Sequence, residues 1–156
     1  MQSATIIYVS QNIVHAYNRT CEPLLRKFDL SQVSFDILMF LANNPEYSTA
    51  QEISEYRHIK KNLVSVHVEK LVSAGLLQRG SVAGDRRKVS LSCTEKARPI
   101  VEEGLKMQEL FYEKVTEGIS ENQWNVCKEI YETIEANAEA MGNKNLIGDV
   151  LWVDTR

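Results

Sequence analysis

The chain has 156 residues, a mass of 17.8 kDa and 44% hydrophobic residues, which is the size and composition of one globular domain and excludes a collagen-like or mostly disordered protein. The longest apolar run, residues 37–42, is too short to span a membrane, and no basic residue precedes Arg19 as a signal peptide requires. We therefore expect a cytoplasmic protein without a membrane partner. The net charge of −3 argues, taken over the whole chain, against a nucleic-acid partner.

Apolar residues at spacings of three and four predict a first helix over residues 5–27, in which Pro23 must kink or restart the helix. Ser31 or Ser34 can cap a second helix, which residues 43–45 end. The apolar residues of this second helix are Phe35, Ile37, Leu38, Phe40 and Leu41.

A short third helix follows, capped by Ser48 or Thr49. Glu52 stands at the spacing that completes a capping box, in which cap and acid bond to each other's backbone N–H groups. We expect Ile53 and Tyr56 to form the buried side of this helix.

A fourth helix is predicted over residues 60–74 and ends at Gly75. Its expected inward residues are Leu63, Val64, Val68, Leu71 and Val72. Residues 76–82 and 87–93 read as two short strands, and residues 83–86 read as the turn between them, which together predict a β-hairpin.

A long helix is expected to open at Thr94, although Pro99 weakens its start. Its apolar residues are Ile100, Val101, Leu105, Leu110, Phe111 and Val115. Residues 118–120 mark a break before a last helix over residues 121–141, and the apolar tail at residues 150–153, which includes a tryptophan, needs something to cover it.

The charge is distributed unevenly along the chain. Residues 57–98 carry a net charge of +7, whereas residues 1–56 carry −3 and residues 99–156 carry −7. This basic middle coincides with the short helix, turn, helix and hairpin. A helix-turn-helix unit can place its second helix in the major groove of DNA, and a basic hairpin behind it can reach the minor groove as a wing.

The segment at residues 84–97, GDRRKVSLSCTEKA, resembles the wing signature of the MarR family of winged helix-turn-helix transcription regulators, which is D-x-R followed by a strand that ends in L-x-L-T. The residues that match this signature are Asp85, Arg87, Leu91 and Thr94. Cys93 replaces the usual Leu. Residues 62–71 look like the family's recognition helix, and residues 75–79 look like its exit into the wing.

The resemblance implies a mainly α fold in which residues 1–156 form a single MarR-like domain. It implies a winged helix-turn-helix lobe of three helices and a β-hairpin wing at residues 31–94, with long dimerisation helices at residues 1–30 and 95–156. The function it implies is sequence-specific binding of double-stranded DNA by a homodimer that represses transcription from a palindromic operator in response to a ligand. The apolar stripes of the terminal helices also favour a dimer.

Ten residues are candidates for DNA contact. On the fourth helix and at its start these are Lys60, Lys61, Asn62, Ser65, Val66 and Lys70, and in the hairpin they are Asp85, Arg86, Arg87 and Lys88. Asn62 can pair with adenine, lysines neutralise phosphates, and arginines suit the minor groove. Asp85 would repel DNA by itself, so we expect it to orient a neighbouring arginine. Many family members carry Arg where Val66 stands, which shifts base reading toward Lys60, Lys61, Asn62 and Ser65.

An effector is expected from the resemblance, since small aromatic or phenolic acids often bind between the two lobes of family members. The polar side chains that could line such a site are His15, Tyr17 and Tyr112. The sequence leaves open whether an effector exists, which operator is bound, and whether the regulator represses or activates. No metal site or cofactor is predicted, because the histidines and the cysteines Cys21, Cys93 and Cys127 lack ligand spacing.

Two alternative functions and two residue roles are weighed beside this interpretation. An enzyme is disfavoured because the chain lacks a phosphate loop, G-x-S-x-G and H-E-x-x-H. A winged helix that binds only proteins would not need the basic middle segment. His67 stands where family members commonly have a core Leu, and we interpret it as a half-buried histidine with one hydrogen bond; the alternative is a pH or metal role. We interpret the cysteines as packed or idle thiols, and the alternative for them is a redox role.

Overall fold

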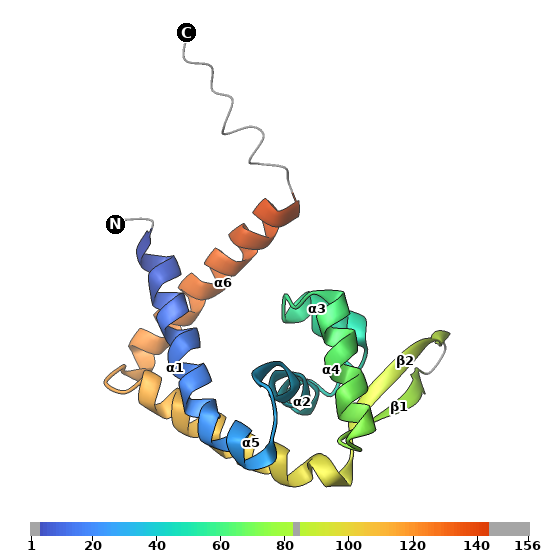
Figure 1. Cartoon of the computed structure of the whole chain (residues 1–156). Coiled ribbons are helices and arrows are strands. Elements are labelled where there is room, and N and C mark those ends of the chain that lie inside the picture. The colour runs from blue at the N-terminus through green and yellow to red at the C-terminus, as the bar shows by residue number, and fades with distance from the viewer. Residues whose placement is uncertain (1–3, 83–84, 144–156) are drawn as a thin grey trace. The chain divides into compact units, whose positions relative to one another are not determined.

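The computed structural model describes residues 4–82 and 85–143 (Figure 1). The elements follow in the order α1 (Ala4–Phe28), α2 (Gln32–Asn43), α3 (Ala50–Tyr56), α4 (Lys61–Ser73), β1 (Leu77–Val82), β2 (Asp85–Cys93), a 3₁₀ turn (Glu95–Ala97), α5 (Arg98–Val115) and α6 (Glu121–Asn143). The predicted mainly helical fold with one antiparallel hairpin is confirmed.

The chain divides into two compact units at Val115. The first holds α1 to α5 with the hairpin, and the second holds α6. Ser120 and Gln123 begin α6 with reciprocal bonds, since the Ser120 N–H donates to Gln123 Oε1 at 2.9 Å and the Gln123 N–H donates to Ser120 Oγ at 3.4 Å. The apolar tail predicted at residues 150–153 lies outside the described residues.

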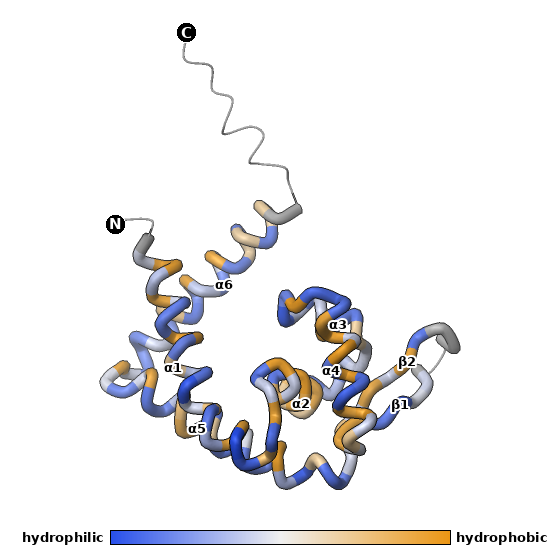
Figure 2. Tube along the Cα trace, in the orientation of Figure 1, coloured by the Kyte–Doolittle hydropathy of each residue, from blue (hydrophilic) through white to orange (hydrophobic). Residues whose placement is uncertain are grey.

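The core of the first unit is built around α2, whose residues are mostly apolar (Figure 2). Its fully buried side chains are Phe35, Ile37, Leu38 and Met39. Helices α1, α4 and α5 and strand β2 pack around it. Burying an apolar side chain of this size contributes roughly 1.5–3 kcal/mol, so α2 supplies a large share of the stability.

Local capping determines where α2 and α3 begin. The Ser31 side chain accepts the Ser34 N–H at the start of α2, as one of the two predicted caps. At the start of α3, Thr49 Oγ1 accepts the Glu52 N–H at 3.2 Å, and Glu52 Oε2 accepts the Thr49 N–H at 2.8 Å. The predicted capping box is therefore confirmed, with Thr49 as the cap.

The hairpin strands extend closer to their turn than predicted. The register runs from Leu77 opposite Cys93 to Val82 opposite Asp85, with an irregularity after Ser81. The prediction that β2 begins at Arg87 is therefore wrong, because Asp85 already pairs with β1. Asp85 and Arg86 read as turn formers in sequence, but both belong to β2 in the structure.

Two residues predicted to be buried are exposed. Leu63 is 40% exposed, because the buried face of α4 is centred on Val64, Val68 and Leu71, and Leu63 lies at its edge. Tyr56 is 54% exposed, since it lies at the end of α3 and covers other aromatic rings instead of entering the core.

The path of α1 at Pro23 and the start of α5 also differ from the prediction. Helix α1 continues through Pro23 as one helix, so the predicted restart does not occur. The side chain of Thr94 does not cap α5; it donates to the carbonyl of Gly75 at 2.6 Å, and a 3₁₀ turn precedes the helix. Pro99 is thus the second residue of α5, in the first turn, where a missing N–H costs little.

Gly104 brings α5 close to α2 and gives a stability prediction. A Cβ at this position would collide with Met39 Sδ and lie 3.0 Å from Phe35 Cε2. We expect Gly104→Val to lower the free energy of unfolding by about 1–3 kcal/mol through overpacking, measured by urea denaturation. Lys106→Val, at an exposed site of the same helix, controls for the helix propensity of Val. Equal losses in both variants would contradict the close approach.

Candidate nucleic-acid interface

Helices α3 and α4 form a helix-turn-helix whose turn spans residues 57–60. Ser54 Oγ donates to the carbonyl oxygen of Ile59 at 2.7 Å, which ties the end of the turn back to α3. His58 has a φ of +50°, and such a left-handed residue lets the chain reverse within a few residues. The turn therefore delivers Lys60 to the N-cap of α4.

The predicted contact residues on α4 share one exposed surface. These are Lys60, Lys61, Asn62, Ser65, Val66 and Lys70, all exposed to solvent. Asn62 Oδ1 accepts the Leu63 N–H at 2.9 Å, and Ser65 Oγ donates to the Lys61 carbonyl at 3.0 Å. Local bonds thus hold both polar side chains on the helix, where they are accessible to a partner.

The acidic residue on α4 is neutralised. Glu69 Oε2 lies 2.5 Å from the guanidinium of Arg79 on β1, in an ion pair that joins α4 to the hairpin. Because a free carboxylate on this surface would repel phosphates, the pairing leaves the lysines to determine the local potential.

The hairpin is attached to the helix-turn-helix by its backbone. The Leu91 N–H donates to the carbonyl of Ser48, which lies just before α3, at 2.6 Å. Lys88 on β2 is exposed. The structure describes Asp85, Arg86 and Arg87 by their backbone alone, so the roles of their side chains stay a prediction.

His67 lies on the inner side of α4. Its Nδ1 is 2.8 Å from Ser34 Oγ and 3.3 Å from Ser31 Oγ, so it joins α4 to the N-terminus of α2. It is buried, more than the half-buried position expected from the sequence. Burial, together with the charge of Lys70, lowers the pKa of His67, which favours the neutral imidazole as a structural hydrogen-bonding group.

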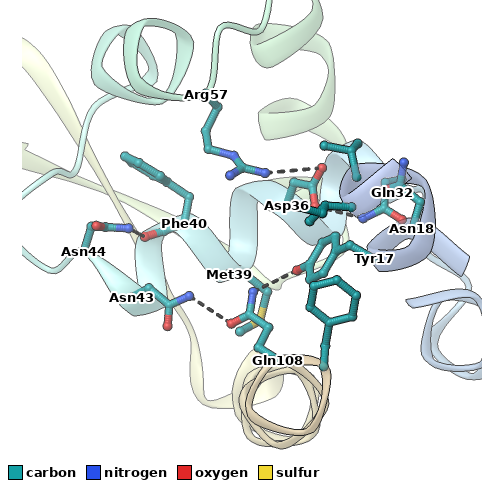
Figure 3. A pocket seen from close by; sticks show the side chains of 13 residues that line it. Tyr17, Asn18, Gln32, Asp36, Met39, Phe40, Asn43, Asn44, Arg57 and Gln108 are labelled. Atoms are coloured by element: carbon teal, nitrogen blue, oxygen red, sulfur yellow. Dashed lines mark hydrogen bonds and ion pairs between the residues drawn. The ribbon is translucent and has the colours of Figure 1, made fainter. Parts of the chain in front are cut away.

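A cavity of about 470 Å³ lies between α1, α2, α5 and the α3–α4 turn (Figure 3). It is lined by Ile13, Val14, Tyr17, Asn18, Gln32, Asp36, Met39, Phe40, Asn43, Asn44, Arg57, Gln108 and Phe111. Of the three side chains predicted to face an effector, Tyr17 lines this cavity, whereas His15 and Tyr112 do not. The structure thus brings together only part of the predicted set.

Hydrogen bonds order the polar wall of the cavity. Asn43 Nδ2 donates to Gln108 Oε1 at 3.0 Å, and Gln108 Nε2 donates to the Tyr17 hydroxyl at 2.8 Å. The Tyr17 ring also contacts Phe111 edge-on at 5.3 Å between ring centres. Burial raises the pKa of Tyr17 to about 12, so the hydroxyl keeps its proton.

An ion pair in the cavity wall was missed by the sequence analysis. Arg57 Nη2 lies 3.7 Å from Asp36 Oδ2, and Gln32 Nε2 donates to Asp36 Oδ1 at 2.9 Å. Burial raises the pKa of Asp36, while Gln32 and Arg57 oppose this shift. The signal in the sequence is the single charge in the apolar run of α2, since a carboxylate there needs partners.

Burial raises the pKa of Cys21 and also that of Cys93, which disfavours the reactive thiolate form. Within the described ranges, no group of three His, Cys, Asp or Glu side chains is arranged to hold a metal ion. None of the helices in this part of the chain combines the length and the apolar composition of a transmembrane span.

Comparisons with known proteins agree with this geometry. A model of the MarR family matches residues 28–88, which hold α2 to α4 and most of the hairpin. The solved structure of the transcriptional regulator PA3341 is 25% identical, with a TM-score of 0.77 over 86% of this chain and 97% of that protein. A comparison with curated proteins gives no match.

Two other solved structures share the fold. Staphylococcus aureus MepR in complex with DNA is 19% identical and has a TM-score of 0.70, over 85% of this chain and 98% of that one. Bordetella bronchiseptica BpsR, whose DNA binding is regulated by 6-hydroxynicotinic acid, is 17% identical and has a TM-score of 0.65, over 83% of this chain and 98% of that one. The helix-turn-helix and most of the hairpin thus match the MarR family of winged helix, DNA-binding transcription regulators over residues 28–88.

Proposed function

We propose that this regulator is a ligand-responsive repressor that binds a palindromic operator as a homodimer. The observation that carries the proposal is the exposed surface at the start of α4, where Lys60, Lys61 and Asn62 lie together while Glu69 is paired with Arg79. A repressor of this kind occupies promoter DNA until an effector weakens its binding.

Each proposed contact has a physical role. Asn62 and Ser65 read base edges in the major groove, and the lysines at positions 60, 61 and 70 neutralise phosphates. Val66, which is exposed, offers an apolar surface to a thymine methyl group. The wing residues Arg86, Arg87 and Lys88 approach the minor groove, with Asp85 orienting an arginine. The lobe that carries these contacts is residues 31–94.

Exposed apolar residues on α1 support a dimer. In the N-terminal half of this helix these are Ile6, Ile7, Tyr8, Val9, Ile13 and Val14. A run of this kind usually marks an interface, and a two-fold symmetric dimer would cover it with the same surface of a second copy. The dimerisation segments, residues 1–30 and 95–156, would then position two lobes for the half-sites of one operator.

The cavity beside Tyr17 supports a small aromatic effector. Its Phe40, Met39 and Phe111 side chains suit an aromatic ring, and its amides and charged pair suit a polar substituent. BpsR responds to 6-hydroxynicotinic acid, which is an aromatic acid. Tyr17 lines the cavity, so it is the strongest of the proposed effector contacts, ahead of His15 and Tyr112.

The wing proposal predicts a change in salt dependence. Arg87→Ala removes one phosphate or groove contact from each half of a dimer, so the plot of log K against log salt should become less steep by about 1.8. Fluorescence anisotropy over a salt series measures this slope on DNA upstream of the protein's own gene and on random duplex. Arg26→Ala, an exposed arginine of α1, is the control. An unchanged slope in folded Arg87→Ala would contradict the wing assignment.

The proposed role of α4 as the recognition helix predicts a loss of DNA affinity that is confined to the operator. Asn62→Ala should cost about 1–3 kcal/mol of binding free energy on the operator, with little effect on random duplex or on the salt slope. The same anisotropy assay measures both, and thermal denaturation tests whether loss of the Asn62–Leu63 bond unfolds the protein. Equal losses on both kinds of DNA would mean that Asn62 only positions the helix.

The dimer proposal predicts a mass near twice 17.8 kDa by light scattering. Ile7, which is 61% exposed, should be covered in the dimer, so Ile7→Glu should weaken association at least about 100-fold, since two apolar side chains lose their burial. Asn12→Glu adds the same charge on the opposite side of α1 and should leave the dimer intact. A monomer that binds the operator tightly would refute the proposal.

A further inference from the structure

Glu69, the single acidic residue of α4, lies among the side chains proposed to read base edges. It follows Asn62 by seven positions, Ser65 by four and Val66 by three, and these spacings place all four residues on one face of a helix. All four are exposed. A carboxylate on a surface that meets phosphates is unfavourable by itself, so its presence there requires an explanation other than charge neutralisation.

Arg79 on β1 holds this carboxylate. Strand β1 packs against α4 (Figure 1). Arg79 lies on the same face of the strand as the buried Leu77, because alternate residues of a strand point to one side. Its guanidinium reaches Glu69 Oε2 at 2.5 Å. The pair therefore connects the proposed recognition helix to the hairpin and restricts where the Glu69 carboxylate can lie.

Stability does not explain the pair. The Glu69 side chain is 62% exposed and that of Arg79 is 45% exposed. An exposed ion pair of this kind contributes little to the folding free energy, since water screens the charges and two long side chains lose freedom. A role in binding accounts for an oriented and exposed carboxylate better than a role in folding does.

The carboxylate can still accept a hydrogen bond from DNA. Arg79 engages Oε2, and a carboxylate has two oxygens with about four acceptor positions. In the major groove, cytosine presents the N4 amino group, which donates to Glu or Asp. Thymine and guanine present acceptor atoms there, which a carboxylate repels. Glu69 can therefore distinguish these bases by the sign of the interaction.

We propose that Glu69 determines sequence specificity by accepting a hydrogen bond from the N4 amino group of a cytosine in each half-site, with Arg79 as its positioning residue. The proposal rests on the proposed function, in which α4 lies in the major groove. Arg79 orients the carboxylate and offsets its charge against the phosphates. Where a half-site lacks the cytosine, Glu69 faces acceptor atoms and opposes binding, so it also rejects incorrect sequences.

The base that Glu69 reads is tested by selection from a library of randomised duplexes with the full-length protein. Wild type should select a cytosine at symmetry-related positions of the two half-sites. Glu69→Gln should select adenine at those positions and the wild-type bases elsewhere, because a glutamine side chain pairs with adenine N6 and N7. Retention of cytosine by Glu69→Gln, or the absence of any change, would overturn the proposal.

Fluorescence anisotropy on the selected duplex measures the size of the effect. Replacing the cytosine by thymine in both half-sites should lower wild-type affinity about tenfold or more, but that of Glu69→Ala less than about twofold. Glu69→Ala should bind random duplex about threefold or more tightly, because a carboxylate leaves the DNA-facing surface. Discrimination by Glu69→Ala equal to that of wild type would refute the contact.

Glu102 supplies the matched control. It is also 62% exposed and is paired with an arginine, Arg98, but it lies on α5. Glu102→Ala removes the same charge from the protein. It should keep the cytosine preference and change the affinity for random duplex less than about twofold. If it strengthens random binding as much as Glu69→Ala does, net charge and not position is responsible, and the rejecting role of Glu69 fails.

The positioning role of Arg79 has its own test. Arg79→Ala should reduce the discrimination between cytosine and thymine to about threefold or less, and Arg79→Lys, which keeps a charge beside Glu69, should restore most of it. In the Glu69→Ala background, Arg79→Ala should cause no further loss of discrimination, since the two residues act as a unit. A loss of affinity on every duplex with discrimination intact would make Arg79 a phosphate contact only.

The outcomes separate this inference from the proposed function. If wild type selects a sequence that Asn62→Ala no longer prefers, while Glu69→Gln selects the same bases as wild type, the proposed function stands and the inference fails. If wild type selects no sequence, the proposed function fails and the inference fails with it. Unfolding cannot imitate the expected result, because an unfolded variant does not acquire a new preference for adenine.

Discussion

Helix α2 is surrounded by other elements on nearly all sides, and this burial is the constraint on which the rest of the first unit depends. Phe35, Ile37 and Leu38 are fully buried although they point to different sides of the helix. Any polar group on such a helix must find a partner within the protein, because an unpaired buried polar group costs several kcal/mol. Two polar residues of α2 consequently make the contacts that reach the DNA-binding helices, Ser34 through His67 and Asp36 through Arg57.

These two contacts attach to different parts of the helix-turn-helix. His67 lies in the middle of α4 and burial favours its neutral form, so its 2.8 Å bond with Ser34 joins two uncharged groups. Arg57 lies in the turn and interacts with Asp36 through a longer ion pair, which is exposed on the Arg57 side. Helix α2 therefore holds the middle of α4 firmly and the turn before α4 more loosely.

Features that depend on residues close together in the sequence could be predicted. The capping box of Thr49 and Glu52 involves residues three apart, and the apolar face of α4 follows from a spacing of three and four, so both could be predicted. Leu63 and Tyr56 were assigned to the core wrongly, because a periodic pattern gives the centre of a face but not its edges. The resemblance identified the helix-turn-helix and the wing from contiguous motifs.

Contacts between distant segments could not be predicted in this way. Tyr17 and Gln108 are hydrogen bonded across 91 positions, and no local pattern indicates that α1 and α5 bring them together. His15 and Tyr17 share one helix, but only Tyr17 turns into the cavity, since the helix presents neighbouring positions to different sides. The lining of the cavity thus depends on the packing of distant segments, whereas the exposed surface of α4 could be predicted from local sequence spacing.

The two ends of α4 are held unequally. At its C-terminal end, Thr94 Oγ1 bonds the carbonyl of Gly75, and Lys96 Nζ bonds the carbonyl of Ala74 at 2.8 Å, so the region before α5 closes over the last turn. Lys60 at the other end has no side-chain cap. The last turn of α4 is therefore tied to the segment before α5 by side-chain bonds that its first turn lacks. The 13 residues of α4 span about 20 Å, and a tilt of about 10° would displace the tip by about 3 Å, close to the rise of one base pair.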